Sequence, residues 1–170
     1  NYRLTPWGIL VKLALYSSLD EFEMIDPKQR SQVDFGGRLD LVGYDLQEAI
    51  PSGDALNIRL YWQTTESVAT GYLVSLRLVD VSGRTVSVIE DRLVSAWYPA
   101  LDVPAGRLVL GVYDLPIPTG LLANQYEVQV VVHDPDTGES LLPASNVTPF
   151  PLGRVAVSAP QRLLARPDDL

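Results

Sequence analysis

The sequence predicts an all-β protein, an immunoglobulin-like or jelly-roll antiparallel β-sandwich of about 7–9 strands. Three observations lead to this prediction. Apolar and polar residues alternate over many short segments, turn-forming residues separate those segments, and sustained helical periodicity is missing. Because the side chains of an extended strand point alternately to its two faces, such alternation describes strands with one buried face.

The clearest strand is predicted over residues 56–63, where large apolar residues occupy every second position and mostly polar residues fall between them. This phase puts Trp62 on the apolar face, so we expect its indole in the core. Residues 126–133 repeat the pattern. There Val128 and Val130 share the apolar face, while His133 falls on the polar one.

Alternation predicts further strands along the chain. They cover residues 38–45, 72–80, 85–93, 107–115 and 154–158, with weaker patterns over 9–16 and 21–25. Asp-Val-Ser-Gly-Arg at 80–84 is typical of a hairpin turn between two of these segments. Asp-Pro-Asp-Thr-Gly-Glu at 134–139 predicts a second hairpin, with Pro at the second position of a type I turn and Gly where a positive φ is favoured.

The chain has 170 residues, which fit one domain or one domain with a small appendage. We expect the sandwich to cover residues 35–159, and residues 1–34 to form an N-terminal extension or extra strands that pack on it. The alternation is lost over residues 160–170, so we expect a loosely ordered tail there. Because the chain begins at Asn1 rather than Met, we expect it to be a fragment of a larger protein.

Composition excludes several classes of function. The chain has no cysteine, which rules out thiol catalysis, disulfides and thiolate-bound metals. Its net charge of -8, from 21 acidic and 13 basic residues, argues against nucleic acid as a partner. No apolar run approaches the roughly 18–20 residues that cross a bilayer. Phosphate-cradling glycine motifs are missing as well, and we predict no cofactor.

Several short motifs resemble those of one family of domains. They are Phe-Gly-Gly-Arg-Leu-Asp-Leu-Val-Gly-Tyr-Asp-Leu at 35–46, Leu-Tyr-Trp-Gln at 60–63, Asp-Val-Ser-Gly-Arg at 80–84, Tyr-Asp-Leu-Pro-Ile-Pro at 113–118, Tyr-Glu-Val at 126–128 and His-Asp-Pro-Asp-Thr-Gly-Glu at 133–139. Across residues 35–157 the chain resembles the C-terminal soluble β-sandwich that follows the membrane segments of bacterial protein-mannosyltransferase-like glycosyltransferases, which use polyprenyl-phosphate sugars. Similar modules occur in membrane proteins of unassigned function.

The resemblance implies an extracytoplasmic location and attachment to the membrane through a region outside this chain. It implies no catalytic residue, because the family's catalytic carboxylates lie in the membrane portion. The residues themselves agree. A Ser–His–Asp triad would have to use His133, the single histidine, which we interpret as a strand residue, and no Gly-x-Ser-x-Gly elbow is present. A carboxylate-dependent hydrolase would need two facing acids in a cleft, one of raised pKa, and no sequence feature singles out such a pair. We therefore expect the isolated domain not to be an enzyme.

A weak calcium candidate lies in the second predicted hairpin. Asp134, Asp136 and Glu139 offer the oxygen ligands that calcium prefers. An EF-hand loop would carry a further acidic ligand where Gly138 stands, and the segment also fits a plain turn. We favour the turn and predict no metal site.

Aromatic residues in a loop are the candidate ligand site. Trp97 and Tyr98 are adjacent in an apparent loop between strands, and aromatic rings stack on the apolar faces of sugars. Trp7, next to Pro6, is a second candidate. The alternative interpretation of Trp97 is a plug that caps one end of the sandwich.

Three functions remain open. The one we predict is a non-catalytic extracytoplasmic accessory domain of a larger, glycosyltransferase-linked membrane protein, which orients glycan or acceptor substrate and contacts the membrane portion of its own chain. The first alternative is a stand-alone carbohydrate-binding module that uses the loop aromatics. The second is a protein–protein interaction or self-association domain, because open sandwiches expose edge strands.

Overall fold

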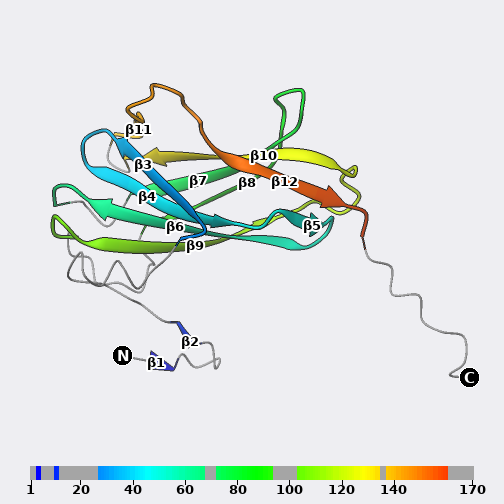
Figure 1. The fold of residues 1–170 in the computed structure, drawn as a ribbon, viewed down its shortest axis with the longest axis horizontal. Coiled ribbons are helices and arrows are strands. Elements are labelled where there is room, and N and C mark those ends of the chain that lie inside the picture. Colours follow the sequence, from blue (N-terminus) through cyan, green and yellow to red (C-terminus); the bar gives the residue numbers. More distant parts are fainter. Residues whose placement is uncertain are drawn as a thin grey trace, which may run out of the picture.

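The computed structural model describes residues 3–4, 10–11, 27–67, 72–93, 103–134 and 137–160. Strands are the only regular elements in these ranges, and no helix long and apolar enough to span a membrane occurs among them. Near the N-terminus β1 (Arg3–Leu4) pairs with β2 (Leu10–Val11). The remaining strands form a 6-stranded and a 4-stranded sheet, stacked in two layers in Figure 1, so the predicted all-β sandwich is confirmed.

The larger sheet has the strand order β5-β12-β10-β7-β8, and the short β11 also pairs with β10. Its strands are β5 (Ala49–Pro51), β7 (Leu73–Val79), β8 (Thr85–Arg92), β10 (Asn124–His133), β11 (Ser140–Leu141) and β12 (Phe150–Ser158). Every pair is antiparallel except β5 with β12, which run parallel.

The smaller sheet is wholly antiparallel and has the order β3-β4-β6-β9. Its strands are β3 (Gln29–Phe35), β4 (Leu39–Leu46), β6 (Ala55–Thr64) and β9 (Leu108–Pro116). The edge strand β3 falls largely within the segment 1–34, which the sequence predicts to be an extension or extra strands.

Most predicted strands correspond to an observed one. The segments predicted over 38–45, 56–63, 72–80, 85–93, 107–115 and 126–133 match β4, β6, β7, β8, β9 and β10, and 154–158 is the second half of β12. Both predicted hairpins are present, β7–β8 around Asp80 and β10–β11 around Asp134. The weaker predictions over 9–16 and 21–25 lie almost entirely outside the described residues.

The core is filled by the inward side chains of both sheets. Trp62 of β6 is 0% exposed, as predicted from its phase in the strand. The Phe35 ring of β3 packs edge-on against it, with ring centroids 5.3 Å apart, and against Phe150 of β12 at 6.0 Å. This aromatic chain links one edge of the small sheet, its centre and the large sheet.

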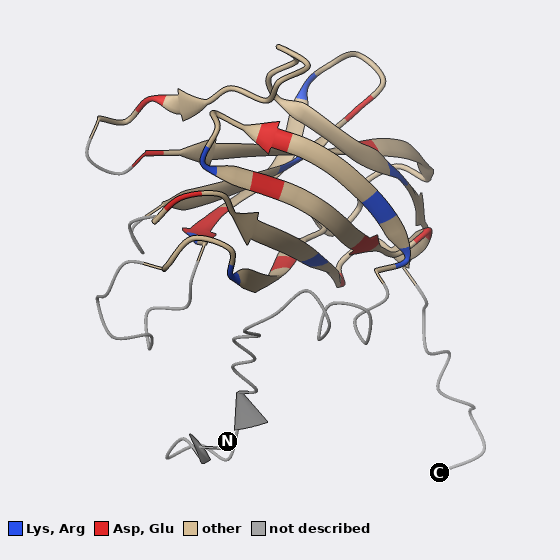
Figure 2. Ribbon diagram, turned by 60° about the vertical axis from the view of Figure 1, so that its left-hand side comes forward, with Lys and Arg blue, Asp and Glu red and all other residues tan. Residues whose placement is uncertain are grey.

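Polar side chains are left on the outer faces of the two sheets. Along β10, Val128, Val130 and Val132 are buried, whereas Glu127 and Gln129 are partly exposed between them. Acidic and basic residues are interspersed along the strands rather than gathered into a basic band (Figure 2). The interior therefore supplies stability, and the outer faces and strand ends supply polar chemistry.

Replacing Trp62 with Ala tests the dependence of the sandwich on this aromatic chain. We expect the variant to lose about 3–5 kcal/mol of unfolding free energy, because a large buried ring is removed from a packed core. Chemical denaturation followed by circular dichroism measures the change. Val112→Ala, at a position 52% exposed on β9, is the control and should change stability by under about 0.5 kcal/mol. A Trp62→Ala variant as stable as this control would contradict the interpretation.

Candidate functional site

Four residues that the sequence singles out lie outside the described residues: Trp7, Trp97, Tyr98 and Asp136. The structure does fix where the segment with Trp97 and Tyr98 leaves and rejoins the sandwich. Leu93 follows β8 and Val103 precedes β9, and both are buried at 1% exposure. The Leu93 N–H donates to the Tyr72 carbonyl at 2.7 Å. Leu93 and Val103, the described residues on either side of this segment, therefore lie at the end of the sandwich where β7 begins.

The weak calcium candidate lies at the same end. The Asp134 N–H donates to the Glu139 carbonyl and the Gly138 N–H to the Asp134 carbonyl, each at 2.8 Å, which closes the β10–β11 turn. Within the turn the Asp134 carboxylate also accepts the Thr137 N–H at 3.3 Å. These contacts are those of a hairpin turn, and no cluster of three metal-ligating side chains occurs among the described residues.

Arg38, in the β3–β4 turn, contacts side chains from two other connecting segments at this end of the sandwich. Its guanidinium donates to the Tyr72 hydroxyl at 2.5 Å and lies 3.0 Å from the Glu66 carboxylate and 3.5 Å from that of Asp134. The hydrogen bond to Tyr72, and less strongly the two carboxylates, raise the pKa of Arg38 above its ordinary value. The cluster joins the small sheet to Tyr72, directly before β7, and to Asp134, directly after β10, so its role is structural.

His133 lies on β10, directly opposite Ser140 of β11. Its Nδ1 is 3.3 Å from the Ser140 hydroxyl. A hydrolytic serine needs its histidine to be oriented by a third group, and in the described part of the chain no carboxylate hydrogen-bonds to His133. Strand pairing alone accounts for the contact, which agrees with the interpretation of His133 as a strand residue.

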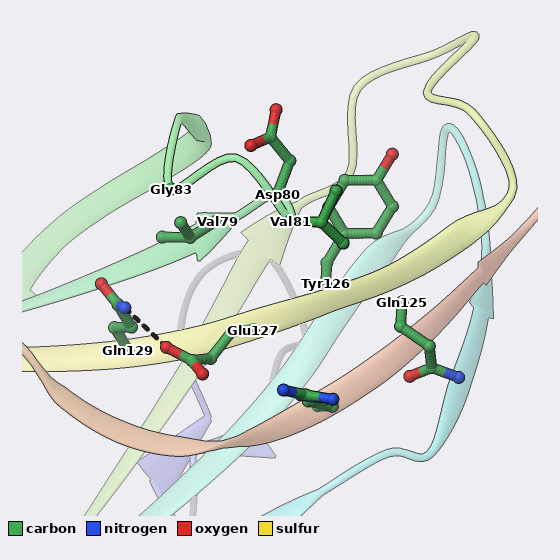
Figure 3. Close-up of a pocket in the computed structure, with 9 residues that line it drawn as sticks. Val79, Asp80, Val81, Gly83, Gln125, Tyr126, Glu127 and Gln129 are labelled. Carbon is green, nitrogen blue, oxygen red and sulfur yellow. Dashed lines mark hydrogen bonds between the residues drawn. The ribbon is translucent and has the colours of Figure 1, made fainter.

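A groove of about 300 Å³ crosses the outer face of the large sheet, and we name it the large-sheet groove. Its lining comes from β10, from β12 and from the end of β7 with the β7–β8 turn (Figure 3). The lining residues are Val79, Asp80, Val81, Gly83, Gln125, Tyr126, Glu127, Gln129 and Arg154. The volume is at the lower end of the ~300–1,000 Å³ typical of small-ligand sites.

Strand register brings the polar groups of this groove together. Glu127 lies between Val79 on β7 and Arg154 on β12 in directly opposed positions. The Gln129 amide donates to the Glu127 carboxylate at 2.7 Å, which fixes both side chains on the sheet face, as Figure 3 shows. The floor therefore holds a carboxylate, a guanidinium and amides, a mixed set of hydrogen-bond donors and acceptors.

The carboxylate of Asp80, at the upper wall of the groove, accepts hydrogen bonds from within the β7–β8 turn. Its carboxylate accepts the Ser82 hydroxyl at 2.5 Å and N–H at 2.9 Å, and the Arg84 N–H at 3.0 Å. The Ser82 hydroxyl and these other donors lower the pKa of Asp80 to about 2. Asp80 is therefore ionised and unsuited to act as a general acid beside Glu127, a role that needs a raised pKa.

Sequence reasoning missed the large-sheet groove. Alternation assigns Glu127 and Gln129 to the polar face of their strand, yet it does not say that β7 and β12 flank β10. That pairing brings in Arg154 and Val79 from distant parts of the chain. The one signal available in the sequence was the dense set of polar side chains at alternate positions of residues 125–129.

No protein-family model matches the chain, and comparison with curated proteins also finds no match. Solved structures do resemble it. The crystal structure of the C-terminal domain of wzt has a TM-score of 0.55 at 13% sequence identity, covering 85% of this chain and 91% of that one. At this identity the likeness shows the fold alone.

Two further structures are similar at lower scores. A β-glucuronidase of glycoside hydrolase family 2 has a TM-score of 0.43 at 13% identity, covering 59% of this chain and 10% of that chain. The CARDB domain of the PF1109 protein from Pyrococcus furiosus, in complex with di-metal ions, has a TM-score of 0.42 at 8% identity, covering 78% and 95%. At these scores neither supports an argument about chemistry.

The contribution of Asp80, in the wall of the large-sheet groove, to the stability of the fold can be tested by substitution. Because its folded-state pKa lies below the ordinary 3.8, its contribution to stability is complete above pH 3.8 and is lost as the pH falls toward about 2. We expect Asp80→Asn to lower the denaturation midpoint at neutral pH and to flatten the loss of stability in that acidic window. Thermal unfolding over a pH series measures this, with exposed Asp54→Asn as control. Equal midpoints for the two variants would contradict the assignment.

Proposed function

We propose that this chain is a non-catalytic, glycan-binding accessory domain of a larger extracytoplasmic membrane protein. The observation that carries the binding part is the large-sheet groove, which gathers Glu127, Gln129 and Arg154 on a rigid sheet face. The accessory and extracytoplasmic parts rest on the resemblance of residues 35–157 to the sandwich of the protein-mannosyltransferase-like family. In that setting the domain would orient the glycan or acceptor substrate of a glycosyltransferase.

The lining of the groove suits a hydroxylated ligand. A sugar hydroxyl both donates and accepts hydrogen bonds, so it can pair with carboxylates, amides and a guanidinium at once. The side-chain amides of Gln125 and Gln129 can both donate and accept hydrogen bonds. Glu127 accepts hydrogen bonds and Arg154 donates them. The apolar side chains of Val79 and Val81 border these groups and can contact the carbon face of a sugar ring. The acidity of the domain, at a net charge of -8, disfavours anionic ligands.

Binding without catalysis fits the chemistry of the groove. Hydrolysis of a glycoside requires one carboxylic acid held protonated and a second carboxylate to act as nucleophile or base. Asp80 is held ionised by its turn, and the side chains lining the groove include no histidine or hydroxyl nucleophile apart from Tyr126, which is only 5% exposed. The Tyr126 hydroxyl in turn donates to the Leu122 carbonyl at 2.9 Å.

The binding proposal is tested by removing the charged groups of the groove. We expect Arg154→Ala and Glu127→Gln to weaken glycan binding roughly tenfold or more, since a hydrogen bond to a charged group contributes about 1.5–3 kcal/mol. A glycan array identifies the bound oligosaccharide, and calorimetry on that oligosaccharide gives the affinities. Arg92→Ala and Glu90→Gln, exposed on β8 of the same sheet, are the matched controls.

The outcomes of this experiment separate the alternatives. Loss of binding in the groove variants alone supports the proposal. Retained binding there, with loss in Trp97→Ala, would assign the ligand to the loop aromatics instead. If the protein binds no glycan on a broad array, glycan binding is overturned and the interaction-domain alternative is left.

The location is tested separately in the intact protein. We expect a reporter enzyme that is active only outside the cytoplasm to be active when fused to this domain, because the resembling sandwiches follow membrane segments on that side. A reporter active only in the cytoplasm, fused at the same position, is the control. Activity of the cytoplasmic reporter instead would contradict the extracytoplasmic assignment.

A further inference from the structure

A second groove lies on the other face of the sandwich, over the outer side of the small sheet. It is an open groove with a volume of about 490 Å³, and we name it the small-sheet groove. Its lining comes from the strands β3, β4 and β6. The lining residues are Arg30, Ser31, Gln32, Asp40, Val42 and Gln63. Like the large-sheet groove, it combines a guanidinium, amides and a carboxylate, and it adds a hydroxyl.

Two adjacent β-bulges shape this groove. Between the pairs Arg30–Gly43 and Val33–Leu41, β3 has two residues where β4 has one. Between Leu41 and Gly43, β4 in turn carries one residue more than β6. Bulges bend a strand and redirect its side chains, and they are frequent beside binding sites. Here they interrupt the flat sheet at the residues that line the groove.

Asp40 lies in this groove and destabilises the fold. Partial burial, and then the charge of Asp34 directly opposite on β3, raise the pKa of Asp40 above its ordinary value. Like charges in directly opposed positions destabilise a sheet. Asp34 accepts the Gly37 N–H at 2.7 Å, whereas no group in the described part of the chain donates a hydrogen bond to the Asp40 carboxylate. A carboxylate that destabilises the fold and accepts no hydrogen bond from any described residue is typical of a binding site.

We propose that the small-sheet groove is a second glycan-binding site, so that the domain holds glycan on both faces of the sandwich. The ligand must supply hydrogen-bond donors to Asp40, which only accepts, and both donors and acceptors to Gln63 and Gln32. Hydroxyl groups of a neutral oligosaccharide meet all of these requirements. This inference rests on the same ligand class as the proposed function but on different residues.

The two grooves cannot belong to one pocket. They open on opposite outer faces, and the packed core between the sheets separates them, with the sheets roughly 10 Å apart. Two sites on one rigid domain allow a long glycan, or two neighbouring chains, to be held at once. The second binding event is then intramolecular and raises the overall avidity.

The experiment is a nuclear magnetic resonance titration of the protein with mannohexaose, a neutral hexasaccharide, followed through side-chain amides. The Gln125 and Gln129 amides report on the large-sheet groove, and those of Gln32 and Gln63 on the small-sheet groove. We expect all four signals to shift in the parent protein. In Asp40→Asn only the Gln32 and Gln63 shifts should weaken, by roughly tenfold in affinity, as a charge-assisted hydrogen bond is lost.

Stability measurements separate loss of binding from damage to the fold. Removing the repelled carboxylate should raise the melting temperature of Asp40→Asn, so weaker binding in a more stable variant cannot result from unfolding. Asp54→Asn, an exposed carboxylate in the turn before β6, is the matched control and should alter neither property. In Arg154→Ala the amide signals of Gln125 and Gln129 should no longer shift on titration, while those of Gln32 and Gln63 should still shift.

The outcomes of the titration distinguish the second site from the large-sheet groove of the proposed function. Shifts at Gln125 and Gln129 alone would overturn the second site and keep the proposed function. Shifts at Gln32 and Gln63 alone would support the second site and overturn the large-sheet groove. Unchanged affinity at Gln63 in Asp40→Asn would overturn the second site alone, whereas no shift at any of the four amides would overturn both glycan sites.

Discussion

Burial of every second side chain between two stacked sheets is the constraint on which the rest of this molecule depends. Leu56, Ile58, Leu60 and Trp62 all point inward from β6 and are fully buried, and the valines of β10 meet them from the other sheet. Among the described residues the interior is filled mainly by apolar side chains. The residues that remain for recognition are those forced outward by the same alternation. In the part of the chain that the structure describes, the candidate residues for recognition therefore lie on the outer faces and at the strand ends.

Alternation predicts the strands whose two faces differ strongly, and it fails where they do not. The strands β6 and β10 carry apolar residues at every second position, and the sequence locates both to within two residues at each end. The edge strand β3 begins Gln-Arg-Ser-Gln, which is polar on both faces, and a bulge after Arg30 interrupts the alternation before Val33 and Phe35. The first half of β12 contains Pro151 and Gly153, which are uncommon in strands, and a register shift. β5 and β11 are too short to show any period.

The candidate sites were harder to predict than the strands, because they depend on pairing between distant segments. Glu127 and Arg154 are far apart in sequence and become neighbours only when β10 pairs with β12. Asp34 and Asp40 are close in sequence and lie opposite each other in a tight β3–β4 hairpin, but this pair was missed because the sequence predicted no strand on the β3 side. The sequence instead singles out the aromatic residues Trp97 and Tyr98, which are conspicuous but do not show how polar groups converge.

Recognition by sheet faces suits a weakly charged, hydroxyl-rich ligand better than it suits catalysis. Outward side chains such as Gln129 and Glu127 are held in place by strand register and by each other, so little conformational entropy is lost when they bind. A reaction would require groups of matched and perturbed pKa to converge on one bond. On the large sheet the turn takes up the Asp80 carboxylate and keeps it ionised, while on the small sheet Asp34 is bound to its own hairpin. Hydrogen bonds that rigidify the turns thus engage these two carboxylates, whereas Glu127 and Asp40 remain in the grooves beside other polar groups that can contact a ligand.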